Sequence, residues 1–267
     1  MIYRALTIAG SDSGGGAGIQ QDLKTFQAFG VWGMTAITAV TVQNTIGVSG
    51  FVELPPETVA EQISAVVSDI GVDAAKTGML ASEPIIEAVA RAIREVEIDR
   101  LVVDPVFVSK HGDPLLHASA VDALRRWIVP LALVVTPNAH EAAGLAGIPE
   151  VRTQADQVSA GRAILALGAR AVLVKGGHVE GPDAVDVLVT ADGIREFAGR
   201  RLDTPNTHGT GCMLSAAIAA GLAKGLDLDV AVGDAKEFVT GAIEHSLAIG
   251  KGIGPVNPSW RLATEAG

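Results

Sequence analysis

The sequence is poor in aromatic residues and in cysteine. Aromatic side chains make up only 4% of its 267 residues, whereas apolar side chains as a whole make up 48%. The core must therefore consist of Ala, Val, Ile and Leu, which is typical of strands covered by helices on both faces. The single cysteine, Cys212, excludes an internal disulfide and a cysteine zinc cluster, and this scarcity suits a reducing cytoplasm.

Positive charge is also scarce. Twenty Lys and Arg residues stand against 30 Asp and Glu residues, for a formal net charge of -10. Such a chain repels nucleic acid and anionic membranes, so any polyanionic small ligand must be held by local groups. No apolar stretch reaches the roughly 18 residues that a membrane span needs, and the N-terminal apolar run is too short for a signal peptide. We expect a cytoplasmic protein with small-molecule ligands, no nucleic-acid partner and no membrane.

Short apolar runs alternate with helix-like segments along the whole chain. Strands are expected at 3–10, 33–43, 72–78, 100–106, 132–138 and 170–177. Helices are expected at 18–29, 55–71, 83–96, 212–224 and 228–247, with another beginning after Pro137. The runs 183–190 and 193–201 predict an antiparallel hairpin. The pattern predicts a single domain over 1–267, with a mostly parallel sheet between two helix layers and a ligand crevice at the carboxyl ends of the strands.

The glycine-rich stretch AGSDSGGGAG follows the first strand and precedes the first helix. It does not match the dinucleotide-binding fingerprint or the P-loop, because it lacks their third glycine and their Gly-Lys-Ser/Thr ending. One interpretation is a plain flexible loop. The other is a ligand loop, in which Asp22, four residues beyond Gly18, faces the ligand from the first turns of the helix.

The stretch HGTGC, residues 208–212, opens another predicted helix. A Gly209-Thr210-Gly211 loop presents free backbone N–H groups at the positive end of a helix dipole, which makes an anion site without side-chain charge. The alternative is capping by Thr210 alone. Cys212 is either an inert buried residue or a thiol whose pKa the helix N-terminus lowers, able to act as a base or nucleophile.

Asn138 and Glu141 lie three residues apart at the start of the helix after Pro137. This spacing fits a capping box, and it equally fits two side chains directed through water at a magnesium ion that bridges phosphates. Asp104 and Lys175 each close an aliphatic strand, where a charge is costly unless it is satisfied, so both are candidate site residues. Lys76 is a weaker candidate of the same kind. The histidines show no metal-ligand spacing, and most should be solvated or capping: 111, 117, 140, 178, 208 and 245.

Seven motifs resemble one family in their order and spacing: AGSDSGGGAGIQQDLKTF, VTVQNTIGV, AAKTGML, DPVFVSKHGDPLL, TPNAHEA, VLVKGGH and NTHGTGC. From about Leu6 to Ile249 the chain resembles the hydroxymethylpyrimidine/phosphomethylpyrimidine kinases of thiamine biosynthesis, in the ribokinase-like superfamily. The resemblance implies a three-layer α/β/α fold and ATP with Mg²⁺ as the phosphate donor. It also implies two successive phosphorylations of a hydroxymethylpyrimidine, and the superfamily suggests a homodimer.

The resemblance also implies roles for the residues that match its motifs. Gln43 would hydrogen-bond the aminopyrimidine in a substrate pocket shared with Gly10, Asp22, Met79 and Asp104. For the nucleotide and metal, the implied residues are Lys175, Thr207, Asn138 and Glu141, the last two as an Asn-x-x-Glu motif that organises Mg²⁺ through water. The amides of Gly209, Thr210, Gly211 and Cys212 would hold the transferring phosphoryl group.

Two positions depart from wider patterns. Cys212 stands where most ribokinase-like sugar kinases have an aspartate base, which favours the pyrimidine and pyridoxal branch over sugars. Phe107 stands where the family often has methionine, on an expected pocket wall. If Cys212 takes the proton of the hydroxymethyl group, Cys212→Ala should keep more of the second activity, whose acceptor is a phosphate largely dianionic above its pKa of about 6.

Three alternative functions remain open from the sequence. The nearest is a pyridoxal or pyridoxine kinase with the same fold and donor. A thiol enzyme that uses Cys212 as a covalent nucleophile is less favoured, because no paired catalytic histidine can be identified. A non-catalytic pyrimidine-binding module is disfavoured by the presence of Asn138, Glu141 and Lys175.

Overall fold

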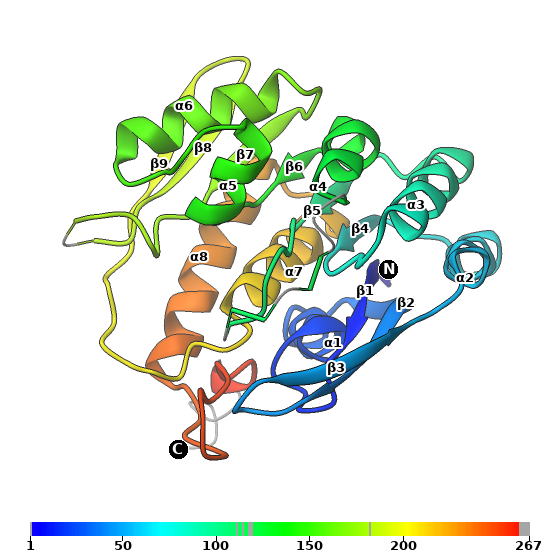
Figure 1. Cartoon of the computed structure of the whole chain (residues 1–267), viewed down its shortest axis with the longest axis horizontal. Coiled ribbons are helices and arrows are strands. Elements are labelled where there is room, and N and C mark those ends of the chain that lie inside the picture. The colour runs from blue at the N-terminus through cyan, green and yellow to red at the C-terminus, as the bar shows by residue number, and fades with distance from the viewer. Residues whose placement is uncertain (1, 111, 114, 117–119, 182, 262–267) are drawn as a thin grey trace.

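The computed structural model describes residues 2–110, 112–113, 115–116, 120–181 and 183–261. Within these residues one sheet runs in the order β3-β2-β1-β4-β5-β6-β7-β8-β9 (Figure 1). Its strands are β1 (Arg4–Ser11), β2 (Trp32–Gln43), β3 (Val48–Glu53), β4 (Ala74–Thr77), β5 (Leu101–Val103), β6 (Val134–Val135), β7 (Ala171–Val174), β8 (Asp186–Thr190) and β9 (Ile194–Phe197).

The sheet is parallel in its middle and antiparallel at both ends. Strands β2, β1, β4, β5, β6 and β7 pair in parallel, while β8 and β9 form the antiparallel hairpin predicted from the sequence. The antiparallel pairing of β3 with β2 was not predicted. β3 was missed because its sequence, VSGFVE, is short and interrupted by Ser49 and Gly50.

Helices cover both faces of the sheet (Figure 1). One layer holds α2 (Pro56–Asp69), α3 (Glu83–Glu95), α4 (Ala120–Ala123), α5 (Ala139–Ala146) and α6 (Gln154–Leu165), with α4 continuing into the helical turns Leu124–Ile128 and Val129–Leu131. The other holds α1 (Gly18–Ala28), α7 (Thr210–Ala223) and α8 (Leu228–Glu244). The three-layer prediction is confirmed, although α4 and α6 were not foreseen and α8 ends three residues early.

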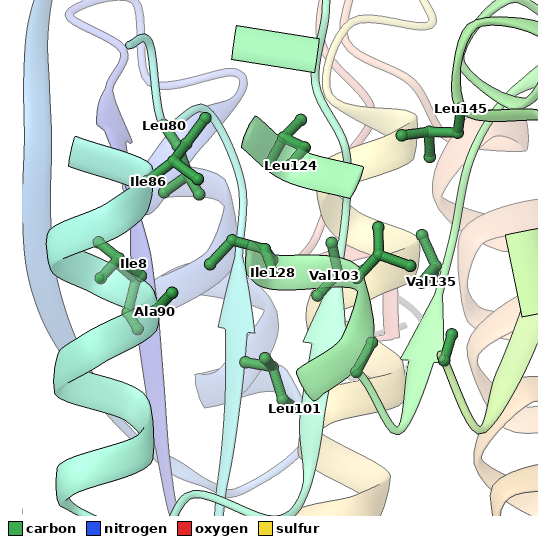
Figure 2. Packing of buried hydrophobic residues seen from close by; sticks show 14 of the residues in the cluster. Ile8, Leu80, Ile86, Ala90, Leu101, Val103, Leu124, Ile128, Val135 and Leu145 are labelled. Carbon is green, nitrogen blue, oxygen red and sulfur yellow. The ribbon is translucent and has the colours of Figure 1, made fainter. Parts of the chain in front are cut away.

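The core forms because strand side chains alternate between the two layers. Leu6 and Ile8 of β1 pack toward α2 and α3, whereas Ala5 packs toward α7. Figure 2 shows part of the core on the side of α2 and α3, in which Leu101 and Val103 of β5 lie among helix residues. α7 is buried along its whole length from Met213 to Ala223, as predicted, and its many alanines allow close packing on α1 and α8. No described helix is both long and apolar enough to cross a membrane.

Candidate active site

A cavity of about 780 Å³ opens at the carboxyl ends of the parallel strands. Because the sheet orders its strands β2-β1-β4-β5-β6-β7, the strand-end residues follow that order along the cavity: Gln43, Gly10, Met79, Asp104, Asn138 and Lys175. Thr207 and the Gly209–Cys212 loop line the same cavity from the side of α7. The structure thus brings together all the predicted site residues except Asp22. Their individual roles stay predictions.

The two glycine-rich loops pack against each other at the cavity floor. A Cβ on Gly209 would lie 1.8 Å from the carbonyl oxygen of Gly16, and one on Gly16 would lie 2.4 Å from the ring of His208. Gly209 also has a φ of +82°, in the left-handed region that favours glycine. Gly209 is therefore required by the approach of the Gly16 backbone, and Gly16 by the approach of the His208 ring, so the first loop is packed in place rather than a plain flexible loop. A ligand-binding role for this loop stays a prediction.

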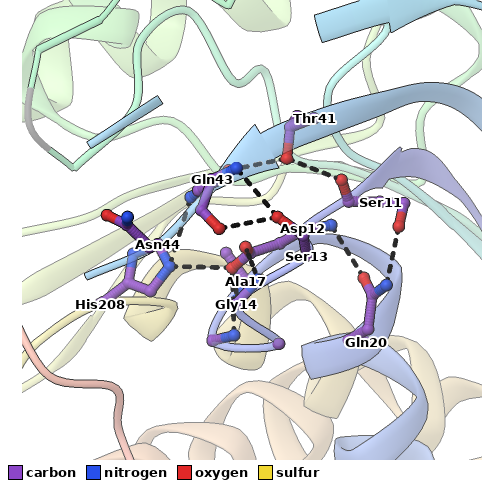
Figure 3. Close-up of polar contacts among 12 residues, drawn as sticks. Ser11, Asp12, Ser13, Gly14, Ala17, Gln20, Thr41, Gln43, Asn44 and His208 are labelled. Atoms are coloured by element: carbon purple, nitrogen blue, oxygen red, sulfur yellow. Dashed lines mark hydrogen bonds and ion pairs between the residues drawn. The ribbon is translucent and has the colours of Figure 1, made fainter. Parts of the chain in front are cut away.

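Asp12 holds the first of these loops in shape. Its Oδ1 accepts from the N–H of Gly14 at 2.8 Å, and its Oδ2 accepts from the N–H groups of Gly16 at 3.0 Å and Ala17 at 2.8 Å (Figure 3). Burial raises the pKa of Asp12, but the His208 and backbone hydrogen bonds outweigh it, so the pKa lies below its usual value. Asp12 is ionised at neutral pH and fixes the loop through its negative charge.

The N-terminus of α7 presents unused hydrogen-bond donors to the cavity. Thr210 N–H is taken by the carbonyl of Thr207 at 3.3 Å, and Met213 N–H by that of Gly209 at 2.9 Å. Among the described residues, the N–H groups of Gly211 and Cys212 meet no acceptor. Thr210 is not a side-chain cap, since its Oγ1 donates to Thr207 O at 2.7 Å. Two free amides at the positive end of the helix dipole have the geometry that the predicted anion site requires, and anion binding there stays a prediction.

Lys175 brings a side-chain cation to the first turn of α7. A Cβ on Gly211 would lie 3.3 Å from Lys175 Nζ, so the ammonium reaches the first turn of α7. Lys175 Nζ lies 3.0 Å from Asp104 Oδ1 and 3.8 Å from Glu141 Oε2. Burial acts to lower the pKa of Lys175. The carboxylates of Asp104 and Glu141 act in the opposite direction and outweigh burial, so the pKa lies above its usual value. Lys175 is therefore charged and fixed in place.

Asn138 and Glu141 form the capping box of α5. Asn138 Oδ1 accepts from Glu141 N–H at 3.0 Å, and Glu141 Oε2 accepts from Asn138 N–H at 2.7 Å. Both residues nevertheless line the cavity, so capping and ligand binding do not exclude each other here. Burial raises the pKa of Glu141 to about 7, with Asp104 adding to the effect and Lys175 opposing it. A cation beside this carboxyl would favour its ionised form.

The thiol of Cys212 corrects one expectation. The helix N-terminus was expected to lower its pKa, yet burial raises the pKa to about 11. Lys76 acts to lower it, while Asp22 and Asp104 add to the increase. Desolvation of the thiolate is the largest of these effects, so Cys212 is a neutral thiol at neutral pH.

Asp22 corrects a second expectation, because it does not line the cavity. Its side chain is fully buried, and its Oδ2 accepts from Thr7 Oγ1 at 2.6 Å and lies 2.9 Å from Lys76 Nζ. Lys76, also fully buried, lies between Asp22 and the cavity, which it lines. Asp22 faces inward because the buried ammonium of Lys76 requires a counter-ion. The sequence placed Asp22 on the right helix turn but could not show that Lys76 lay opposite it.

Phe107 corrects a third expectation, since it does not form a pocket wall. It is 8% exposed and belongs to the core, where a Cβ on Gly144 would lie 2.6 Å from its ring. The neighbouring Val106 and Val108 line the cavity instead. Because side chains of an extended segment alternate, the aromatic ring points away from the ligand.

Three polar residues that line the cavity were missed by the sequence analysis: Asp12, Thr41 and His208. His208 was grouped with the solvated histidines, but it is 5% exposed and its Nε2 lies 3.0 Å from Asp12 Oδ2 and 3.4 Å from Gln43 Nε2 (Figure 3). Thr41 Oγ1 lies 3.2 Å from Gln43 Oε1. The sequence did contain one signal, since Asp12 is the one acidic residue inside the glycine-rich stretch AGSDSGGGAG. His140, His178 and His245 are exposed as expected, and His111 and His117 lie outside the described residues.

Comparison with known proteins identifies relatives over the whole chain. The family model for phosphomethylpyrimidine kinase matches residues 12–257. The hydroxymethylpyrimidine/phosphomethylpyrimidine kinase of Streptomyces coelicolor is 52% identical over 257 residues, covering 96% of this chain and 94% of the relative. That of Escherichia coli is 46% identical over 255 residues, covering 95% and 96%.

Solved structures extend the comparison to a neighbouring activity. The pyridoxal kinase of Bacillus subtilis, solved as an ADP complex, has a TM-score of 0.91 and 41% identity, covering 98% of this chain and all of the other. The pyridoxal kinase of Staphylococcus aureus with AMP-PCP and pyridoxal has a TM-score of 0.90 and 33% identity, covering 98% and 95%. The fold is therefore ribokinase-like, and the family match decides between the two groups: the chain belongs to the phosphomethylpyrimidine kinase family.

Proposed function

We propose that the protein phosphorylates 4-amino-5-hydroxymethyl-2-methylpyrimidine with ATP, first to the monophosphate and then to the diphosphate, in thiamine biosynthesis. One observation carries the proposal. A single cavity holds an amide, Gln43, that can pair with an aminopyrimidine edge, and an anion site made of the Gly211 and Cys212 amides beside Lys175. The relatives named for this activity support the same substrate.

The first reaction is an in-line transfer of the γ-phosphoryl group. The hydroxymethyl oxygen forms a bond to the γ-phosphorus as the bond from that phosphorus to the bridging oxygen of ADP breaks, and ADP leaves with the electron pair. Catalysis of this step is mainly positioning and charge stabilisation. The amides of Gly211 and Cys212 and the Lys175 ammonium are placed to stabilise the three phosphoryl oxygens. The hydroxyl proton passes to a base or to water.

The second reaction uses the same donor and the same anion site. Its acceptor is the phosphate monoester formed first, which is largely dianionic near pH 7 because its second pKa is about 6. No proton has to be removed from the attacking oxygen. The neutral thiol of Cys212 is therefore no obstacle to this step, and any role of Cys212 as a base belongs to the first.

We further propose Mg²⁺ as the ion that accompanies ATP. Magnesium retains several waters and takes few protein carboxylates, and the described residues contain no cluster of three or more metal-ligating side chains. A carboxylate acting through water fits this, and Glu141 beside Asp104 provides one. Asn138 Oδ1 already accepts from Glu141 N–H, which leaves the amide NH₂ of Asn138 to donate to a phosphate oxygen. When bound, the metal supplies charge neutralisation between phosphates.

Two broader features complete the proposal. We propose a homodimer, supported by exposed Val40, Val42, Ile46 and Val52 on β2, β3 and the turn between them, since an exposed apolar patch favours a protein partner. We propose a cytoplasmic location, supported by the use of ATP and the single thiol.

The test is incubation with ATP, Mg²⁺ and the hydroxymethylpyrimidine, followed by mass spectrometry. We expect both mono- and diphosphate products. Competition between this pyrimidine and pyridoxal for one enzyme sample separates the nearest alternative, and a clear preference for pyridoxal would overturn the proposal. Absence of any ATP turnover with pyrimidine present would support a non-catalytic module, and a covalent Cys212 adduct would support a thiol enzyme.

A further inference from the structure

A chain of polar contacts joins the first glycine loop to the amide of Gln43. Asp12 Oδ2 lies 3.0 Å from His208 Nε2, which lies 3.4 Å from Gln43 Nε2, and Gln43 Oε1 lies 3.2 Å from Thr41 Oγ1. Thr41 Oγ1 in turn donates to the carbonyl of Ser11 at 2.9 Å. All five residues line the cavity (Figure 3).

The ring nitrogen His208 Nε2 must carry a hydrogen. Asp12 is an ionised carboxylate that already accepts from three backbone N–H groups, so it can only accept. A bare nitrogen lone pair at 3.0 Å from this carboxylate would be repelled by it. His208 therefore donates from Nε2 to Asp12, whatever the state of its other nitrogen.

This direction decides how Gln43 faces His208. A nitrogen that carries a hydrogen cannot accept from the NH₂ of Gln43, so an NH₂ facing it would set two donors against each other. Turning the amide by half a turn puts Oε1 beside His208 Nε2–H, whose one hydrogen is directed mainly at Asp12 and is shared with Oε1, and puts the NH₂ against Thr41 Oγ1. Since Thr41 gives its own hydrogen to Ser11 O, its oxygen is free to accept, and every donor then meets an acceptor.

We propose that His208, held by Asp12, is a positioning residue that turns the carbonyl oxygen of Gln43 toward the Gly209–Cys212 loop and so orients the pyrimidine for phosphoryl transfer. The inference rests on the proposed substrate. An amide pairs with N3 and the 4-amino group of the ring, its oxygen accepting from the amino group and its NH₂ donating to N3. With the oxygen on the His208 side, the amino group lies on that side too.

The position of the reactive group follows from the covalent structure of the ring. The 5-hydroxymethyl group is next to the 4-amino group, whereas the 2-methyl group lies beyond N3. An oxygen on the His208 side therefore directs the hydroxymethyl group at the loop that begins at Gly209. The reversed amide would direct the methyl group there and leave the hydroxyl remote from the phosphoryl group.

The test compares two substrates across variants: the natural pyrimidine and its 4-deamino analogue, which keeps N3 and the hydroxymethyl group. We expect the wild type to prefer the amino compound in kcat/KM, and His208→Leu to reduce that preference roughly tenfold, as for loss of one oriented hydrogen bond. His208→Gln keeps an N–H near the position of Nε2 and should restore most of the preference. His245→Leu, a histidine outside the cavity, is the matched control. Nucleotide affinity should be unchanged in all variants.

A merely structural role for His208 would lower turnover of both substrates equally, and that result would overturn the inference. Loss of the preference in His208→Gln would do the same. A structure of the wild type with bound pyrimidine gives a second readout independent of any variant, and a 2-methyl group facing the Gly209–Cys212 loop would overturn the inference. Absence of pyrimidine phosphorylation by the wild type would instead overturn the proposed function.

Discussion

Buried polar side chains around the cavity are paired: Lys76 lies against Asp22 and Lys175 against Asp104 and Glu141, as ion pairs, and the His208 ring lies against the Asp12 carboxylate. Under the proposed function, a chain with a net charge of -10 binds a nucleotide and a phosphorylated acceptor in this cavity. The groups that we propose for this are two free amides and cations held in place by carboxylates. Cys212 lies among these groups. Burial, Asp22 and Asp104 raise the pKa of its thiol and Lys76 lowers it, with a neutral thiol as the result.

At the residue scale, Cys212→Ala should lower the first phosphorylation severalfold at pH 7 and the second less. With a pKa of about 11, only about one thiol in ten thousand is ionised at pH 7. The thiolate fraction rises about tenfold per pH unit below the pKa, so the ratio of wild-type to variant first-step rates should grow from pH 7 to pH 9. Separate steady-state assays of the two steps measure this, and equal losses in both steps would refute a base role.

The buried pair under Cys212 gives a second prediction at this scale. Asp22→Ala leaves the Lys76 ammonium buried without a counter-ion, which should lower the free energy of unfolding by about 3–5 kcal/mol. Asp122→Ala, which removes an exposed carboxylate 3.5 Å from Arg125, is the control and should have a far smaller effect. Urea denaturation compares the two. The double variant Asp22→Leu/Lys76→Met should recover most of the loss, and failure to recover would mean that the pair is not the cause.

At the element scale, the start of α7 depends on the contact between the two glycine loops. Gly209→Ala should reduce activity at least a hundredfold, because its Cβ would collide with Gly16 O and displace the anion site. Gly225→Ala is the matched control, since Gly225 has a φ of +83° with open space around it. It carries the same backbone strain, of order 1 kcal/mol, without the collision. Steady-state kinetics and thermal unfolding of both variants test this. An equal loss of activity in Gly209→Ala and Gly225→Ala would contradict the role of the collision.

The start of α5 offers a comparison between two capping boxes. Asn138→Ala and Thr153→Ala each remove an N-cap, of α5 and α6, and each should cost about 1 kcal/mol of stability. Only Asn138 lines the cavity, so only Asn138→Ala should raise the KM for ATP or lower kcat, by about tenfold or more. Kinetics and denaturation curves of both variants test this. Full activity in both would mean that Asn138 acts only as the N-cap of α5.

At the scale of the whole molecule, the C-terminal end of β2 has one face in the cavity and one face in solvent. Thr41 and Gln43 line the cavity, while Val42 between them is 65% exposed, and Val52 on β3 is 69% exposed. Val42→Lys with Val52→Lys should convert the proposed homodimer to a monomer in sedimentation velocity. Ile194→Lys, on β9 at the opposite edge of the sheet, should not. A monomeric wild type would contradict the proposal.

The sequence by itself determined the alternation of strands and helices, the mostly parallel sheet and the glycine turn that begins a helix at residues 209–212. These follow from local signals: aliphatic runs of strand length, helical periodicity and glycines at a helix start. The pattern of short polar breaks after each strand also located the cavity, because the carboxyl ends of parallel strands share one edge. Family resemblance added the identity of the acceptor.

Only the tertiary structure decided which charges face each other. Asp22 pairs with Lys76, which lies 54 positions away in the sequence, and does not face the cavity. His208 contacts Asp12, which lies 196 positions away. Burial at the meeting point of β1, β4 and α7 raised the pKa of Cys212 where a helix end alone predicted a decrease. Desolvation and pairing of charges depend on neighbours distant in sequence, so no local pattern carries them. The glycines at residues 209 and 211 shape the start of α7, where we propose that phosphate binds, and the packing around Cys212 decides the state of its thiol.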